Sequence, residues 1–341
     1  MCPSDEFEFF FEKEWSDGLP VIPPTEEKVS RMLSSIKDSP EELVGEFPPA
    51  FSSVSIYSIA VHAVMAGCKP EYMNLLIASV RAILKEKFNL NGLQATLSPA
   101  APFLLVNGVY SKEIGLNGGL GCFGPGFRAN ATIGRAIRLM MMNLGSGIPG
   151  ISTMSTFSSS SRYTFCIAEN ETESPWEPLS VTLGFSEDEN IVTAIAAEAP
   201  ITVWDDMSNE PLPLLRSIAD SMSHLGSMNI CGDTDQIIVF SPQQAKICSD
   251  AGLSKEKVKE ILLDKAGRSM SEIRNTGRYT VSRIKSWSID ADPEDDDFFV
   301  PSVKNPDRLF IIVAGGIPGP MSAVMNGWNG TSRAVSEKID S

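Results

Sequence analysis

Histidine is scarce in this sequence and the cysteines are scattered, which argues against a zinc site. The 341 residues include two histidines, His62 and His224, and six cysteines, none of which forms a C-x-x-C pair. Structural and catalytic zinc sites use clustered cysteine and histidine ligands, so we expect no zinc here. Isolated cysteines in a chain of this length are typical of reduced thiols in a cytoplasmic protein.

Positive charge and long apolar runs are also lacking. The chain carries 28 basic and 43 acidic residues, a net charge of −15, and no basic stripe, which excludes a nucleic-acid partner. No apolar run reaches membrane-spanning length, and MCPSDEFEFFFEKEW lacks the basic and apolar regions of a secretion signal. We therefore expect a cytoplasmic protein that binds neither nucleic acid nor membrane. An anion site in such a chain must act at short range.

The length and hydrophobic content predict an α/β protein with two lobes. A chain of 341 residues exceeds the usual size of one domain, and its 43% hydrophobic content is enough for a sizeable core. We expect mixed sheets with flanking helices and a cleft lined by glycine-rich loops. The expected parts are an N-terminal arm and first helix (1–50), an α/β lobe with a glycine-rich anion loop (51–160) and a second α/β lobe (161–341).

Local patterns predict the individual elements. Residues 1–24 contain a proline-rich end and predict an extended arm, and Thr25 followed by two glutamates predicts the start of a helix. Helical periodicity predicts helices over 54–67, 72–87, 211–225, 243–250 and 255–265. Branched apolar runs predict strands over 93–97, 103–106, 163–168, 181–185, 191–197, 201–204, 236–240 and 308–314.

A glycine-rich loop runs directly into a predicted helix over residues 117–143. Gly124 and Gly126 let the backbone approach a ligand closely, and the following helix would direct free N–H groups at an anion. Arg128, Asn130 and Arg135 are the candidate anchors, the arginines through bidentate contacts. The loop is neither G-x-G-x-x-G nor a P-loop, because no Gly-Lys-Ser/Thr follows. The alternative is a glycine-rich turn packed inside the fold.

Cys68 is the candidate nucleophile. It lies next to Lys69 and just before Pro70, a residue that suits the first position of a helix. A helix N-terminus and a neighbouring cation both lower the pKa of a thiol, which favours the thiolate. His62 is a candidate partner, although it lies six residues back on the preceding helix and a pair with Cys68 needs a bend at Gly67. The alternative is a buried, unreactive cysteine.

An acidic segment follows the predicted strand over 163–168. Glu169, Glu171 and Glu173 alternate, so in an extended chain they share one side. Clustered carboxylates suit acid–base catalysis, with Glu169 or Glu171 as the reacting group, or they can bind a divalent cation. Trp176 would then form a wall of the pocket. A solvated acidic loop is the third interpretation.

Two further loops complete the predicted cleft. Residues 145–161 are rich in glycine and serine and suit a mobile lid. Gly315 and Gly316 follow the continuous apolar run over 308–314, so they repeat the arrangement of a glycine-rich loop after a strand. We expect each lobe to supply one glycine-rich loop to a shared cleft.

Several motifs resemble those of a largely uncharacterised bacterial protein family. These motifs are DGLPVIPPT, AVMAGCKPEY, GPGFRANATIGRA, ENETESPWEPL and the VAGG loop near the end of the chain, and together they span nearly all of it. The family is associated with small thiol or selenol proteins that carry a U/C-Gly-Ser-Cys motif, which this sequence lacks. The resemblance implies a redox or thiol-transfer context in which a partner protein holds the redox thiol.

Three functional hypotheses follow. The first is an enzyme that acts on a small carboxylate-bearing or other anionic substrate through the Cys68 thiolate, with lyase or reductase chemistry at a C–S or C–heteroatom bond. The second is a non-catalytic subunit that binds a small ligand and docks a thiol redox protein. The third is a metalloenzyme that uses Glu169 and Glu171. No cofactor is assigned, and the expected partners are a small anion, a thiol or selenol protein and further copies of the chain.

Overall fold

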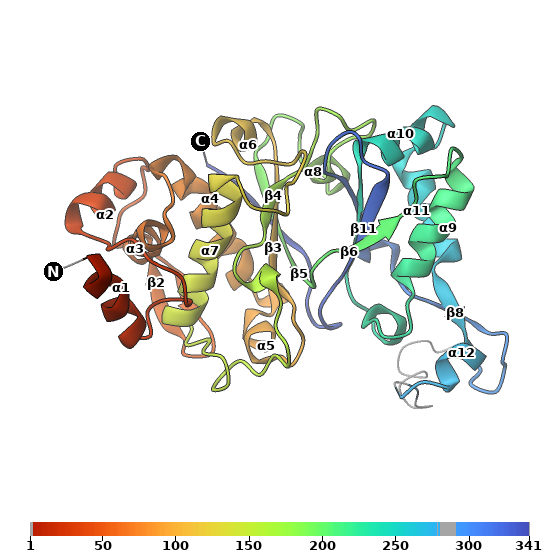
Figure 1. Ribbon diagram of the computed structural model, residues 1–341, viewed down its shortest axis with the longest axis horizontal. Helices are drawn as coiled ribbons and strands as arrows, with labels where there is room; N and C mark the ends of the chain where they lie inside the picture. Colours follow the sequence, from red (N-terminus) through yellow and green to blue (C-terminus); the bar gives the residue numbers. More distant parts are fainter. Residues whose placement is uncertain (1–2, 278, 280–290, 341) are drawn as a thin grey trace. The chain divides into compact units, whose positions relative to one another are not determined.

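The computed structural model has the predicted α/β architecture, with mixed sheets and flanking helices (Figure 1). It describes residues 3–277, 279 and 291–340. The chain forms two compact units: unit 1 comprises Met1–Ala168, Phe185–Ile195 and Ala334–Ser341, and unit 2 comprises Glu169–Gly184 and Ala196–Arg333. The chain therefore passes from one unit to the other four times, after residues 168, 184, 195 and 333.

The sheet of unit 1 has the strand order β12-β5-β3-β4. These strands are β3 (Ala101–Asn107), β4 (Cys166–Ala168), β5 (Ile191–Ala197) and β12 (Val335–Lys338). β3 is parallel to β4, and β12 is antiparallel to β5. Every residue of β3 and β5 is buried, as expected for apolar strands covered on both faces.

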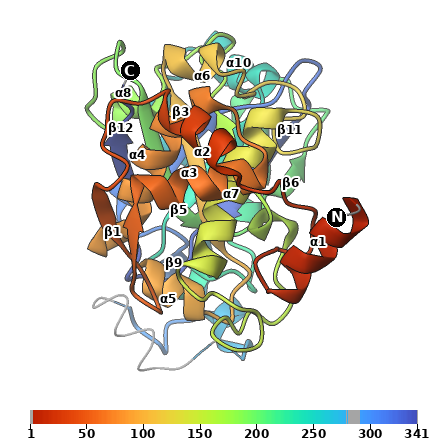
Figure 2. The same ribbon diagram turned by 90° about the vertical axis from the view of Figure 1, so that its left-hand side faces the viewer.

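The helices of unit 1 pack around α3 (Ile56–Ala66), which contacts α2 (Glu26–Leu33), α4 (Met73–Leu84) and α7 (Arg128–Asn143) (Figure 2). Thr25 caps α2 as predicted, since its side chain accepts a hydrogen bond from the Lys28 N–H. α7 also contacts β4. The remaining elements of unit 1 are α1 (Pro3–Glu12), β1 (Leu43–Phe47), β2 (Ser52–Ser55), α5 (Leu90–Ala95) and α6 (Val109–Glu113).

The sheet of unit 2 has the order β10-β7-β11-β6. β10 (Leu309–Val313) and β7 (Gln236–Phe240) are parallel, and β11 (Met321–Asn326) is antiparallel to β7 and to β6 (Ile201–Trp204). The core contains side chains of this sheet together with those of α9 (Pro211–Met222), α10 (Pro242–Asp250) and α11 (Lys255–Lys265). The shorter elements are α8 (Leu179–Thr182), β8 (Gly267–Ser269), α12 (Met270–Arg274) and β9 (Phe299–Pro301).

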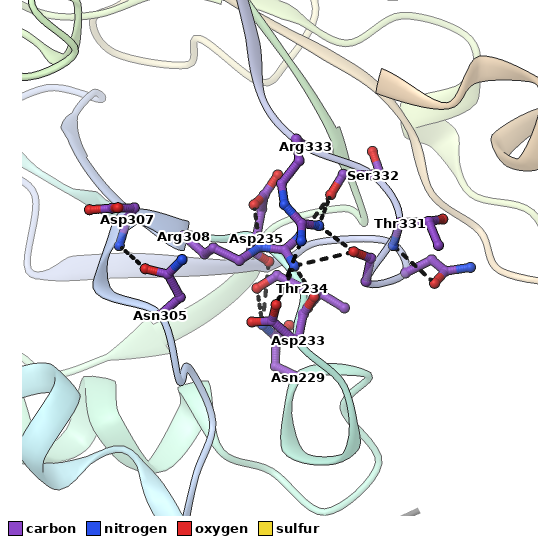
Figure 3. A network of polar contacts seen from close by, with 12 residues as sticks. Asn229, Asp233, Thr234, Asp235, Asn305, Asp307, Arg308, Thr331, Ser332 and Arg333 are labelled. Carbon is purple, nitrogen blue, oxygen red and sulfur yellow. Dashed lines mark hydrogen bonds and ion pairs between the residues drawn. The ribbon is translucent and has the colours of Figure 1, made fainter. Parts of the chain in front are cut away.

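A buried arginine joins three distant segments of unit 2 (Figure 3). Arg308, only 2% exposed, pairs through Nε with Asp235 Oδ1 and through Nη1 with Asp233 Oδ2, both at 2.9 Å. Its Nη2 donates to the Ser332 carbonyl oxygen at 2.7 Å. The guanidinium thus fixes the segments before β7 and after β11 to the start of β10.

Three predicted elements are wrong. The arm over residues 1–24 contains a helix, α1, before its proline-rich part. The predicted strand over 93–97 overlaps α5, which begins after Asn89, whose side chain accepts a hydrogen bond from the Gly92 N–H. The predicted strand over 181–185 overlaps α8 and the turn that follows it. The two strands were predicted wrongly because a short apolar run fits a buried helical turn as well as a strand.

The helices also bear on the membrane prediction. Across residues 3–277, 279 and 291–340, none of the helices is both long enough and apolar enough to cross a membrane.

Candidate functional site

A cavity of about 460 Å³ in unit 1 is lined by two arginines. Arg138 projects from α7, and Arg162 lies in the segment that leads to β4. We call this cavity the serine pocket, since three consecutive serines belong to its wall. Its lining residues are Asp17, Arg138, Met142, Pro149, Phe157, Ser158, Ser159, Ser160, Arg162 and Tyr163.

Arg162 is a buried cation held by neutral groups. Its Nε donates to the Ala100 carbonyl oxygen (3.1 Å), Nη1 to Thr153 Oγ1 (2.9 Å) and Nη2 to the Ser98 carbonyl oxygen (3.0 Å). These bonds fix the guanidinium in one orientation. Among the residues that the structure describes, no carboxylate forms an ion pair with it.

Arg138 has more free donors than Arg162. Within the described part of the chain it makes one hydrogen bond, from Nη2 to the Gly147 carbonyl oxygen at 3.3 Å, and no ion pair. Burial first, and then the positive charge of Arg162, lower the pKa of Arg138 to about 10, and the negative charge of Asp17 opposes this shift. The side chain remains charged at neutral pH. A bound anion would relieve the repulsion between the two guanidinium groups and could accept two parallel hydrogen bonds from Arg138.

Asp17 contributes a carboxylate to the pocket wall, but this carboxylate already has a partner. Arg135 binds it through two hydrogen bonds of 2.8 Å, from Nε to Oδ2 and from Nη2 to Oδ1. Arg135 also donates to the carbonyl oxygens of Leu19 and Pro20. Its guanidinium therefore fastens the N-terminal arm to α7, a structural role in place of the predicted anion contact.

The loop over 145–161 forms the outer part of the serine pocket. Ser146 and Ser158, near its two ends, have positive φ values of 54° and 57°, which are uncommon for residues other than glycine. Phe157, next to Ser158, is 95% exposed although it lines the pocket.

The glycine-rich loop before α7 is closed by its own side chains. The predicted anchor Asn130 is buried: its Oδ1 accepts from the Asn117 N–H, and its Nδ2 donates to the carbonyl oxygens of Asn117 and Cys122. These bonds hold the loop together, so Asn130 has a structural role. Gly126 has a φ of 115° with open space on its side-chain face, and the neighbouring Gly124 is exposed.

Arg128 is the part of the predicted anion site that stays accessible. It is exposed at the N-terminus of α7, where no side chain caps the helix, and its Nε donates to the Gly67 carbonyl oxygen at 3.0 Å. This arrangement combines an uncapped helix N-terminus with one exposed arginine. The serine pocket offers two arginines and a defined cavity, so it is the better candidate for an anion site.

Cys68 does not have the environment that was predicted for it. Burial raises its pKa to about 12, despite its hydrogen bond to the Thr132 carbonyl oxygen and the charges of Arg128 and Arg135. The predicted lowering of the pKa is therefore wrong. The effects of a helix terminus and of Lys69 are outweighed because the thiol is removed from water. His62 is also buried, its Nδ1 contacts the Ser58 carbonyl oxygen (2.7 Å), and desolvation lowers its pKa.

The acidic segment is not an extended row of carboxylates. Residues 171–173 form a turn, so Glu169 is buried whereas Glu173 is exposed. Glu169 accepts hydrogen bonds from the N–H groups of Leu179 (2.8 Å) and Val313 (3.3 Å). These bonds connect the segment to α8 and β10. Glu171 is half-buried, and its predicted acid–base role stays a prediction.

Trp176 and the second glycine loop belong to the framework of unit 2. The indole of Trp176 packs edge-on against Phe240 with ring centroids 5.5 Å apart, and its Nε1 donates to the Leu253 carbonyl oxygen. It is a core residue rather than the wall of a pocket. The Gly315 carbonyl oxygen accepts a hydrogen bond from Asn170 Nδ2 (3.0 Å), and Gly316 is buried.

The metal hypothesis gains no support from the described residues. Among them, no group of three or more histidine, cysteine, aspartate or glutamate side chains could hold a metal ion. Glu169, one of the two predicted ligands, already accepts two backbone hydrogen bonds.

Sequence reasoning did not assign Arg138, Arg162 or the serines to a site. Two signals were available. Arg138 lies three residues after Arg135 and therefore on the same side of a helix, and Arg162 follows a run of four serines. What could not be read from the sequence is that the serine run returns to the face of α7 that carries Arg138. A comparison with known protein families and with curated proteins finds no match to the chain.

Proposed function

We propose that unit 1 binds a small anionic ligand in the serine pocket. The observation that supports this function is a cavity of about 460 Å³ lined by two guanidinium groups, neither of which is paired with a carboxylate of the described residues. An anion bound at this position compensates two positive charges at once, that of buried Arg162 and that of half-buried Arg138. The function is that of a small-ligand-binding protein, which is the ligand-binding part of the second hypothesis drawn from the sequence; the docking of a thiol redox protein stays a prediction.

The two arginines have different tasks in this proposal. Arg162 is held by three neutral acceptors and supplies a fixed positive charge. Arg138 has the free donors and makes the direct contact with the anion. A planar carboxylate matches the fork of a guanidinium, so Arg138 binds it through two hydrogen bonds.

A thiolate reaction at Cys68 is not part of this proposal. A pKa of about 12 leaves the thiol protonated at neutral pH, and the side chain is only 7% exposed. Both properties oppose nucleophilic attack on a substrate.

Calorimetric titration with benzoate and with benzyl alcohol, its neutral counterpart, tests the requirement for an anion. We expect wild-type protein to bind benzoate and to bind benzyl alcohol far more weakly. Arg138→Ala should lose affinity for benzoate by roughly thirtyfold or more, since removing one partner of a desolvated charge pair costs about 2–5 kcal/mol. Arg138→Lys should restore part of the loss because it keeps the charge but not the fork.

Two matched controls remove an arginine elsewhere. Arg128→Ala tests the glycine-loop site, and Arg216→Ala removes an exposed arginine of α9 in unit 2. Both should bind benzoate as wild type does. If Arg128→Ala abolishes binding while Arg138→Ala does not, the anion site is the glycine-rich loop and the present assignment fails.

A further inference from the structure

The walls of the serine pocket are only partly polar. Met142 and Arg138 lie four residues apart on α7, so both side chains lie on the same side of that helix. Pro149 and Phe157 add two further apolar side chains from the loop over 145–161. A carboxylate held by Arg138 would therefore have an apolar surface next to it.

The volume of the pocket exceeds what a bare anion needs. Cavities of 300–1,000 Å³ typically hold ligands with a sizeable apolar part, and this one has about 460 Å³. Part of the polar wall is already engaged within the protein. Ser159 Oγ is already engaged with Ser161 Oγ (2.5 Å) and the Pro99 carbonyl oxygen (3.3 Å). The planar fork of the Arg138 guanidinium matches a carboxylate, which can accept two parallel hydrogen bonds from it.

Phe157 is the residue of the pocket wall with the most exposed apolar side chain. Its ring is 95% exposed, and in soluble proteins a phenylalanine is usually buried. The backbone next to it is constrained, since Ser158 has positive φ and its N–H donates to Ser155 Oγ at 3.2 Å. Phe157 thus lies at the pocket in a loop segment with its own internal contacts.

We propose, on the basis of the proposed function, that the serine pocket selects carboxylates that carry an apolar chain or ring, and that Phe157 determines this selectivity. Arg138 holds the carboxylate, and the apolar part lies against Met142, Pro149 and Phe157. Ligand binding removes the Phe157 ring from water together with the apolar part of the ligand, which is the source of the added affinity.

The test compares acetate with hexanoate, which has the same charged group and four additional methylenes. Each fully buried methylene improves affinity by roughly fourfold, so wild type should bind hexanoate at least ~10 times more tightly than acetate even if the chain is only half buried. Phe157→Ala should reduce this ratio to about threefold, because it weakens the binding of hexanoate more than that of acetate. Met154→Ala is the matched control, because Met154 is a half-exposed apolar residue of the same loop that does not line the pocket.

The outcomes separate this inference from the proposed function. Equal affinity for acetate and hexanoate, with both dependent on Arg138, overturns the inference and leaves the anion site in place. An unchanged ratio in Phe157→Ala overturns the role of Phe157. Absence of binding of either acid overturns the inference and the proposed function together. Tighter binding of inorganic phosphate than of hexanoate contradicts the assignment to carboxylates.

Discussion

At the scale of single residues, burial decides which groups of this protein can react. Cys68 and Cys166 are both buried in unit 1, and removal from water raises the pKa of each thiol. Burial shifts the pKa of Arg138 in the opposite direction, because removal from water lowers the pKa of a cation. Sequence position alone suggested a reactive Cys68, whereas the environment makes it an inert one.

The stability of the protein should fall in alkaline solution because of Cys68. Its folded pKa of about 12 lies above the ordinary value of 9.0, so the folded state keeps its proton where the unfolded state loses it. The contribution to stability is complete below pH 9 and is lost as the pH rises to 12. At about 1.4 kcal/mol per pH unit, the loss approaches roughly 4 kcal/mol. Urea unfolding at pH 8 and pH 11 should show a smaller decrease for Cys68→Ala than for wild type, and equal decreases would contradict the assigned pKa.

Alkylation offers an independent check on the same residue. In native protein at pH 8, iodoacetamide should label Cys68 about a thousandfold more slowly than it labels free cysteine, because the thiolate fraction falls in proportion to the shift in pKa. Peptide mass spectrometry after a timed reaction measures the rate, and urea-unfolded protein provides the fully reactive control. Labelling of native Cys68 at the rate of free cysteine would restore the hypothesis of a nucleophile.

At the scale of elements, α7 is the helix on which the candidate site depends. Arg138 and Met142 line the pocket from this helix, Arg135 holds the N-terminal arm, and Asn130 closes the glycine-rich loop. Gly134 lets the helix approach the segment before β4. A Cβ atom at this position would meet Thr164 Oγ1 and lie 2.5 Å from the Phe165 amide nitrogen.

Gly134→Ala should therefore destabilise unit 1. Alanine favours a helix over glycine by about 1 kcal/mol, but overpacking against backbone atoms costs about 1–3 kcal/mol and displaces α7 from β4. Thermal unfolding should show a lower Tm, and benzoate affinity should fall as Arg138 moves. Gly226→Ala is the control, since only a side-chain carbon 3.8 Å away meets the added Cβ there. A Tm for Gly134→Ala equal to wild type would show that the helix and strand can separate freely.

The sequence predicts elements better where they are defined locally. β3, β7 and β10 are continuous apolar runs, and α2 and α11 have serine or threonine caps, so each was predicted near its observed bounds. β11 and β12 were not predicted, because each forms mainly by pairing with a strand that is distant in the sequence. The serine pocket was missed for the same reason: it depends on the return of residues 157–163 to α7.

At the scale of the whole molecule, charge is distributed very unevenly. The net charge is −15, yet Arg138 and Arg162, which form no ion pair with a described residue, both line the serine pocket, and a third arginine, Arg308, is buried in unit 2. Arg308 differs from the pocket arginines because two aspartates neutralise it. The protein therefore contains arginines in two kinds of environment. The charges of Arg138 and Arg162 are available to a ligand, whereas the charge of Arg308 is neutralised by aspartates within the fold.

Arg308→Met should severely destabilise unit 2. The substitution leaves Asp235, whose side chain is 4% exposed, as a buried carboxylate without its guanidinium, and breaking a buried ion pair in this way costs about 3–5 kcal/mol. Urea unfolding measures the loss, and hydrogen exchange should increase in peptides that contain residues 229–240 and 326–333. Arg333→Met, which removes a half-exposed arginine from the edge of the same network, should change stability by less than about 1 kcal/mol. Equal effects of the two substitutions on stability would show that Arg308 is not the central residue of this network.

The position of β12 along the chain has a consequence for biosynthesis. β12 pairs with β5 in unit 1, but its residues 335–338 follow the whole of unit 2 in the sequence. While the ribosome translates unit 2, β5 therefore presents an open edge with unsatisfied backbone groups, which is a site for mistaken pairing with other nascent chains. The sheet of unit 1 can close only after residues 335–338 have left the ribosome, so native unit 1 forms only after unit 2 has been translated.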